Sequence, residues 1–81
     1  MSITVELQYF ASLRDRTGVE HERLSTSADT LEALYRECDA RHGLGWPIAK
    51  LRVAANGEFA RWDDPVADGD RVAFIPPVSG G

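Results

Sequence analysis

Few side chains in this chain of 81 residues are of types that react or bind metal ions. The single cysteine, Cys38, cannot form an internal disulfide, and neither His21 nor His42 has a Ser, Cys or Asp at a spacing that suggests a triad. One cysteine and two histidines also do not make a ligand set with the spacing of a metal site. We therefore predict no metal site, and we interpret Cys38 as a core thiol and the histidines as surface residues.

Two acidic pairs follow the middle of the chain, Asp63-Asp64 and Asp68-x-Asp70. They resemble paired carboxylates or half a calcium loop, but no 12-residue loop with a terminal glutamate accompanies them. Because they flank Pro65 and Gly69, which are typical turn residues, we interpret the carboxylates as turn formers.

The last residues of the sequence, Gly80 and Gly81, carry the most suggestive chemistry. They cannot cradle a phosphate, since that geometry requires a helix to begin after the glycines. Lacking Cβ atoms, they could instead enter a narrow channel and present an α-carboxylate. A carboxylate with a pKa near ~3.5 is an anion and a poor electrophile at neutral pH, so it must be activated. With no nucleotide-binding motif in the chain, adenylation by ATP implies a separate activating enzyme.

Hydrophobic periodicity predicts the strands and helices that would hold this C-terminal segment. Alternating apolar residues indicate strands at 3–10, 19–24, 51–55, 58–62 and 71–75, and Asn56-Gly57 favours a tight hairpin. A short helical turn is expected at 11–17, and the main helix should begin at an Asp29 cap and end at Gly43. The order predicts an α+β fold in which one main helix covers one face of a mixed five-stranded sheet. Residues 1–75 would form the domain and 76–81 a flexible tail, whose residues are Pro76, Pro77, Val78, Ser79, Gly80 and Gly81.

The uncovered face of that sheet should be polar, yet the alternation along the strands places three large apolar residues on it. These are Phe10, Phe59 and Ile75. Single exposed apolar residues are common, but a cluster of them would form a partner-binding patch.

Composition excludes several classes of function. The net charge is −4, and the basic residues are scattered, so the pattern of a nucleic-acid-binding protein is missing. No apolar run is long enough for a membrane span, and the first residues lack the basic region of a secretory signal. We expect a cytoplasmic protein that binds no nucleic acid and no membrane.

The segment DGDRVAFIPPVSGG, 68–81, resembles the C-terminal signature of the MoaD family, the small subunits of molybdopterin synthase within the ubiquitin-like β-grasp superfamily. The YFASLRDRTG and AANG segments fit the same family. The resemblance implies a sulfur carrier that binds no cofactor itself. An E1-like (MoeB-like) adenylyltransferase would use ATP to adenylate Gly81, and a sulfurtransferase system would convert it to a thiocarboxylate. The tail would then enter the large (MoaE-like) subunit and donate sulfur to cyclic pyranopterin monophosphate.

The resemblance also implies partner contacts at Phe10, Phe59 and Ile75, with Arg14 near them. The carrier would form part of a sulfurtransferase enzyme whose pocket residues lie on the large subunit. Two alternatives use the same Gly-Gly chemistry: a sulfur carrier for thiamine or tRNA thiolation, and a ubiquitin-like protein modifier. A third is a binding module that uses only the sheet face.

Overall fold

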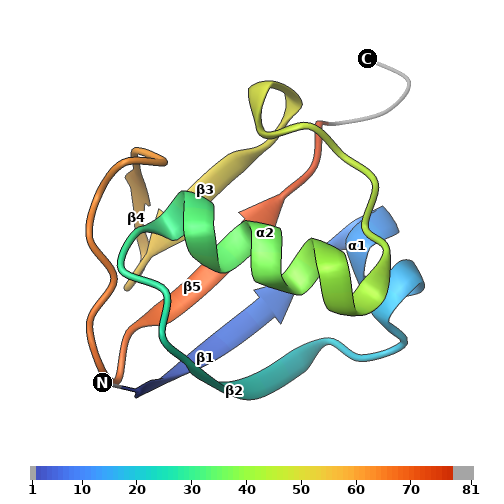
Figure 1. Ribbon diagram of the computed structural model, residues 1–81. Helices are drawn as coiled ribbons and strands as arrows, with labels where there is room; N and C mark the ends of the chain where they lie inside the picture. Colours follow the sequence, from blue (N-terminus) through green and yellow to red (C-terminus); the bar gives the residue numbers. More distant parts are fainter. Residues whose placement is uncertain (1, 78–81) are drawn as a thin grey trace.

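A computed structural model describes residues 2–77, in which helices pack on a mixed sheet of five strands (Figure 1). The elements, in chain order, are β1 (Ile3–Tyr9), α1 (Ala11–Thr17), β2 (His21–Thr26), α2 (Leu31–His42), the 3₁₀ helix η1 (Ile48–Lys50), β3 (Arg52–Ala55), β4 (Glu58–Ala60) and β5 (Arg71–Ile75). The strands lie in the order β2-β1-β5-β3-β4, with β1 and β5 parallel and the other neighbours antiparallel. The predicted fold class is confirmed.

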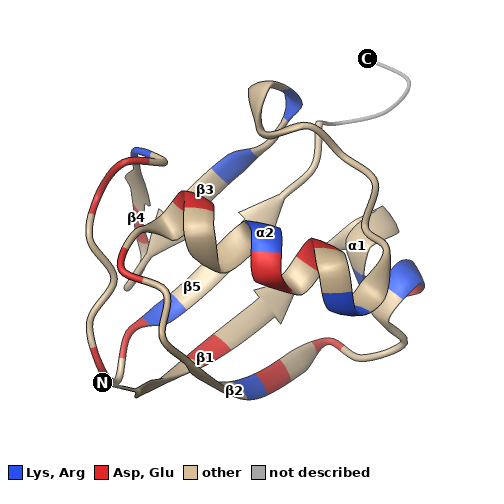
Figure 2. Cartoon of the chain, in the orientation of Figure 1, with Lys and Arg blue, Asp and Glu red and all other residues tan. Residues whose placement is uncertain are grey.

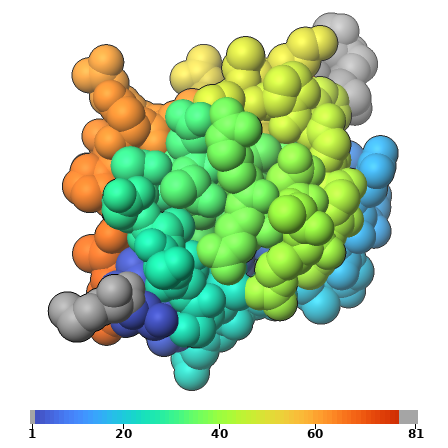
Figure 3. Space-filling view, viewed as in Figure 1, coloured from blue at the N-terminus to red at the C-terminus, as the bar shows by residue number. Residues whose placement is uncertain are grey.

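The core lies between the sheet and α2. Alternate residues of β1 (Val5, Leu7 and Tyr9) are buried, and α2 packs its buried Leu34 and Tyr35 against this side of the sheet. In the space-filling view, atoms of α2, drawn in green, cover the middle of this face (Figure 3). We call it the covered face, and the opposite side the open face.

Strand β5 connects the two halves of the sheet, because it pairs with β1 on one side and with β3 on the other. Its Phe74 is fully buried, stacks on Trp62 at 6.1 Å and meets Tyr35 edge-on at 5.1 Å between ring centroids. Such aromatic contacts stabilise a core beyond simple burial. The last strand before the tail is therefore anchored on its covered side.

Several predicted strand boundaries are wrong by one or two residues. The second strand is 21–26 rather than 19–24, because Gly18 adopts a left-handed conformation (φ 78°) and the Thr17 hydroxyl holds Val19 in a local turn. The fourth strand stops at Ala60 rather than at residue 62, since the Arg61 N–H donates to the Asp64 carboxylate instead of to the ladder. The first and third strands are each one residue shorter than predicted, and the sequence analysis did not predict η1.

The predicted helix cap at Asp29 is also wrong. Thr30 is the N-cap of α2, and its Oγ1 accepts a hydrogen bond of 3.1 Å from the Ala33 N–H. The Asp29 carbonyl instead accepts from the Val66 N–H, which ties this segment to the turn before β5. The helix ends at Gly43 (φ 66°) as predicted, and Asn56-Gly57 forms the predicted hairpin with both φ angles positive (54° and 88°).

The aspartates after β4 form turns, as predicted. Carboxylate oxygens of Asp64, Asp68 and Asp70 accept hydrogen bonds from the backbone N–H groups of Arg61, Thr4 and Ala67 at 2.7–3.0 Å.

None of the helices within residues 2–77 combines the length and the apolar character that a membrane span needs.

Candidate functional site: the open face and the end of β5

The end of β5 is the described part of the predicted reactive segment. The strand stops at Ile75, as the two prolines predict, because proline has no N–H to donate to a ladder. Pro76 is buried and Pro77 is exposed. Val78, Ser79, Gly80 and Gly81 lie outside the described residues. The structure therefore fixes the point from which the predicted tail starts, beside the end of β1 and the beginning of β3.

Phe10, Phe59 and Ile75 line the same shallow groove on the open face. Phe59 is 72% exposed and Phe10 is 39% exposed, whereas Ile75 is half-buried. The alternation pattern could not show whether these three residues lie close together, and the structure places them around one groove. We call it the open-face groove. Its other lining side chains come from β1, β2, β3, β5 and the 56–57 turn.

Small residues form the middle of the groove. Ala54 and Ala73 are direct partners in the β3–β5 pair, and Gln8 and Phe59 are paired to them on either side. Side chains of directly paired residues lie on the same face of a sheet. The two alanines therefore make a low floor between larger side chains. The sequence analysis did not identify these alanines, although the alternation along their strands places both on the open face.

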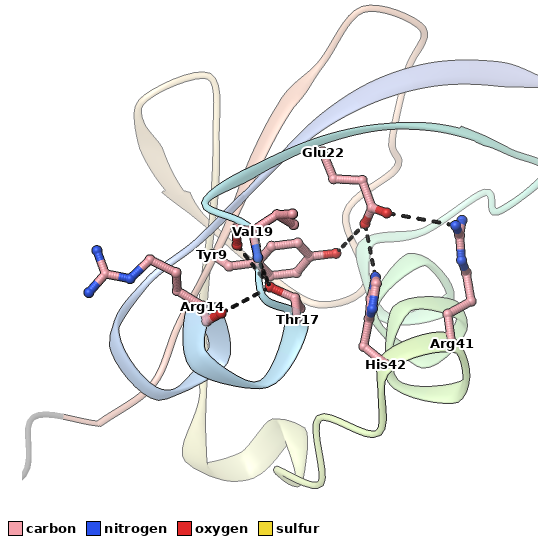
Figure 4. A network of polar contacts seen from close by, with 7 residues as sticks. All are labelled: Tyr9, Arg14, Thr17, Val19, Glu22, Arg41 and His42. Atoms are coloured by element: carbon pink, nitrogen blue, oxygen red, sulfur yellow. Dashed lines mark hydrogen bonds and ion pairs between the residues drawn. The ribbon is translucent and has the colours of Figure 1, made fainter.

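Arg14 does not line the groove. It lies exposed on α1, where its carbonyl accepts hydrogen bonds from the Gly18 N–H at 2.9 Å and the Thr17 hydroxyl at 3.3 Å. Its side chain points away from Tyr9, Glu22 and His42 (Figure 4). The structure brings together three of the four residues expected to contact a partner.

Charged side chains border the groove unevenly. Glu6 and Arg71 are direct partners in the β1–β5 pair, and Glu6 also forms an exposed ion pair of 3.4 Å with Arg23. The guanidinium carbon of Arg52 lies 5.9 Å from the centre of the Phe59 ring, within the range of a cation–π contact. The open face therefore has an apolar end beside Arg52, whereas Glu6 and Arg71 lie together elsewhere along the groove.

A polar cluster joins β1, β2 and the end of α2 away from the groove (Figure 4). The Tyr9 hydroxyl donates to Glu22 Oε1 at 2.8 Å, and His42 Nε2 lies 3.1 Å from the same oxygen. Arg41 lies 3.7 Å from the other carboxylate oxygen. Glu22 and His42 side chains are each only 19% exposed. The prediction that His42 is a surface residue is wrong, because the last turn of α2 packs its ring edge-on against Tyr9.

This cluster shifts the pKa values of its members. Burial would raise the pKa of Glu22, but hydrogen bonds from Tyr9 and His42 and the nearby charges of His42 and Arg41 outweigh it, so the pKa lies below its usual value. Burial and the neighbouring acidic groups raise the pKa of Tyr9. The tyrosine therefore remains a hydrogen-bond donor, and the cluster joins three elements rather than presenting a reactive group.

Cys38 is in the core, as predicted. It is buried on α2, and burial raises the pKa of its thiol to about 11. A thiol that stays protonated is neither a nucleophile nor a metal ligand. Within residues 2–77, no three His, Cys, Asp or Glu side chains lie together as a metal site. What the described residues offer is a binding surface beside the start of the tail.

Comparison with known proteins agrees with this geometry. The model of the ThiS family matches residues 7–81. The molybdopterin synthase sulfur carrier subunit of Escherichia coli (strain K12) is 36% identical over 81 residues, with 95% of this chain and 99% of that protein covered.

Solved structures give the same picture. SAMP1 from Haloferax volcanii superposes with a TM-score of 0.81 at 28% identity, with 96% of this chain and 99% of SAMP1 covered. Subunits 1 and 2 of molybdopterin-converting factor from Helicobacter pylori 26695 have been solved as a protein-protein complex. A chain of that complex matches with a TM-score of 0.65 at 25% identity, covering 98% of this chain and 100% of that one.

Proposed function

The chain belongs to the ThiS family, and from this membership we propose that it is the sulfur carrier subunit of a molybdopterin synthase. The observation that carries the proposal is the match to the E. coli sulfur carrier subunit over nearly the whole of both proteins. The family match also includes Gly80 and Gly81, so it extends over the residues to which the chemistry is assigned.

The reactive group in this proposal is the α-carboxylate of Gly81. As an anion it resists nucleophilic attack, so an activating enzyme first transfers AMP from ATP to it and releases pyrophosphate. Sulfur at the sulfide level then attacks the acyl carbon and displaces AMP, which leaves a glycyl thiocarboxylate; sulfur delivered as a persulfide would require a thiol to cleave the resulting acyl disulfide. The thiocarboxylate sulfur forms a bond to a carbon of cyclic pyranopterin monophosphate, water then cleaves the acyl–sulfur bond and returns the Gly81 carboxylate, and two such transfers build the dithiolene of molybdopterin.

The proposed partners divide the remaining chemistry. An E1-like adenylyltransferase binds ATP, a sulfurtransferase supplies sulfur, and the large synthase subunit binds the pterin. The Helicobacter pylori complex of subunits 1 and 2 supports a large-subunit partner. In residues 2–77 we find a raised thiol pKa and carboxylates used in turns, which fits a carrier that does not catalyse the reaction alone.

The open-face groove is the proposed docking surface for these partners. Phe10, Phe59 and Ile75 supply apolar area next to the start of the tail. Burying one such side chain fully contributes roughly 1.5–3 kcal/mol. A partner that covers the groove would thereby hold the end of β5 while residues 76–81 reach its pocket.

A protein-modifier role is the second candidate, because SAMP1, a small archaeal modifier protein, superposes closely. A modifier would join Gly81 to amines of other proteins through isopeptide bonds. Chains built on itself through lysine would have a single attachment site, since Lys50 is the only lysine.

Intact mass spectrometry of the protein isolated from its host separates these functions. A sulfur carrier is expected to show replacement of one oxygen by sulfur, located at Gly81 by fragmentation. A series of covalent adducts to other proteins would instead support the modifier. A terminus that is unmodified in every sample would contradict both.

Deletion of Gly81 tests the assigned residue. We expect the variant to fold with an unchanged circular dichroism spectrum but to yield no molybdopterin with the activating enzyme, a sulfur source and the large subunit. A Ser79→Ala variant serves as the control and should retain most activity. Full activity of the deletion variant would overturn the assignment.

A further inference from the structure

Arg52 occupies a special place on the open face. It is the first residue of β3, and its direct partner in the antiparallel β3–β5 pair is Ile75, the last residue of β5. Because paired residues present their side chains to the same face, Arg52 flanks the point where the chain leaves the sheet. No other basic residue of residues 2–77 is paired with Ile75.

An aromatic ring orients the Arg52 side chain. Its guanidinium carbon lies 5.9 Å from the centre of the Phe59 ring, which is itself 72% exposed. A planar guanidinium that rests on a ring loses part of its freedom but keeps its N–H donors available at its edge. The pair Arg52–Phe59 therefore presents an apolar surface and oriented donors side by side.

Those donors have no acceptor within the described chain. In residues 2–77 the ion pairs are formed by other cationic residues, namely Arg23, Arg36, Arg41, His42 and Arg61. No hydrogen bond of the Arg52 side chain accompanies its cation–π contact there. An Arg that is held in place next to exposed apolar area is ready to bind a planar anion.

The charge is unevenly distributed around the groove: Glu6 and Arg71 line it, Asp70 is hydrogen-bonded to the lining residue Asn56, and Arg52 lies beside Phe59 and Ile75 at another end. The chain carries a net charge of −4, and many of its acidic residues follow β4 on the way to β5 (Figure 2). On the open face, Glu6 is engaged by Arg23, whereas Arg52 and Arg71 have no carboxylate partner among residues 2–77. The end of the groove beside Arg52, Phe59 and Ile75 thus suits a surface that combines apolar and acidic side chains.

We infer that Arg52 is a specificity-determining contact, whose guanidinium binds a carboxylate on the protein surface that covers the open-face groove. The inference rests on the proposed function, under which that surface belongs to the large synthase subunit. Covering Phe59 and Ile75 excludes water from the pair, so the charge-assisted hydrogen bonds become stronger than they would be in solvent. A partner without the carboxylate would leave Arg52 covered and unpaired, and it would be rejected.

The test measures binding of the full-length chain to the large subunit by isothermal titration calorimetry. We expect Arg52→Glu to raise the Kd about tenfold to a hundredfold, because it removes charged hydrogen bonds and adds a repulsion. Arg52→Lys keeps the charge but loses the planar donors, so it should raise the Kd only about threefold. Arg36→Glu on α2 is the matched control, since it changes the net charge equally but lies on the covered side, and we expect less than about a twofold change.

Salt dependence distinguishes an ion pair from lost packing. The difference in Kd between wild type and Arg52→Glu should shrink as NaCl is raised, because screening weakens both the lost attraction and the new repulsion. An Arg52→Glu variant that binds like wild type, or no more weakly than Arg36→Glu, would overturn this inference alone. A loss independent of salt would also overturn it. If wild-type protein failed to bind the large subunit, the proposed function would fail as well.

Discussion

The two faces of the sheet differ in how many packing and polar contacts their side chains make within the described chain. On the covered face, Phe74 is enclosed by aromatic rings, and the nearby Glu22 carboxylate has three polar partners. On the open face, Phe59 is largely exposed, and Arg52 rests on it with no carboxylate partner among residues 2–77. Neighbouring residues of one strand, Phe74 and Ile75, belong to different faces. Alternate residues of the same strands therefore stabilise the core and line the groove that we propose as the docking surface.

The largest effect is expected on the covered face. Phe74→Ala should lower the free energy of unfolding by about 3–5 kcal/mol, because it leaves a cavity among Tyr9, Tyr35 and Trp62. Urea denaturation followed by circular dichroism measures the loss. Ile75→Ala, one residue further, is the matched comparison and should cost less than half as much. Equal losses at the two positions would contradict the division between the faces.

Phe59→Asp should weaken partner binding strongly and change the free energy of unfolding little. We expect its Kd for the large subunit to rise at least about tenfold, since a charge replaces an aromatic side chain that the proposed partner would bury. Its free energy of unfolding should change by less than about 0.5 kcal/mol, because the side chain is 72% exposed. Phe59→Leu keeps apolar area and should bind nearly as well as wild type. A Phe59→Asp variant that unfolds readily would show that the open face also supports the fold.

Tyr9→Phe tests the polar cluster beside the core. Removing the hydroxyl takes one donor from Glu22 and should lower the free energy of unfolding by about 1 kcal/mol. Binding of the large subunit should be unchanged, although the next residue, Phe10, lines the groove. A larger effect on binding than on unfolding would mean that the cluster positions the open face.

The smallest expected effect is a dependence on pH. The pKa of Glu22 is lower in the folded chain than its ordinary value of 4.5, so its ionised form stabilises the fold above that pH. This contribution is lost as the pH falls through the folded-state pKa and the carboxylate becomes protonated. Wild type should therefore lose more unfolding free energy between about pH 6 and about pH 3 than Glu22→Gln does. Identical pH profiles would exclude Glu22 as a contributor.

Local sequence was sufficient for most of the fold. Period-2 alternation in 3–10 and 71–75 predicted the buried faces of two strands, and the helical spacing of Leu31, Leu34, Tyr35 and Cys38 predicted the buried face of the main helix. Asn56-Gly57 and Gly43 predicted where the chain turns, because positive φ angles favour these residue types. Boundaries failed where a side chain of one segment competed with the ladder, as Thr17 and Asp64 do.

The candidate site was predictable in its members but not in its arrangement. The alternation pattern marked Phe10, Phe59 and Ile75 as outward, whereas their adjacency depends on the strand order β2-β1-β5-β3-β4. That order brings β5, the last strand, between the first and third. No local pattern encodes which strands become neighbours, since pairing depends on contacts between distant segments.

The sequence by itself determined the fold class, the outward phase of the apolar residues and the resemblance of its last residues to a sulfur carrier's terminus. Each of these depends on residue type and short-range spacing. Only the tertiary structure decided that Arg52 lies opposite Ile75 and over Phe59, that Ala54 and Ala73 form the groove floor, and that His42 is half-buried against Tyr9. These features join residues far apart in the chain, and long-range strand pairing and helix packing are what bring them together.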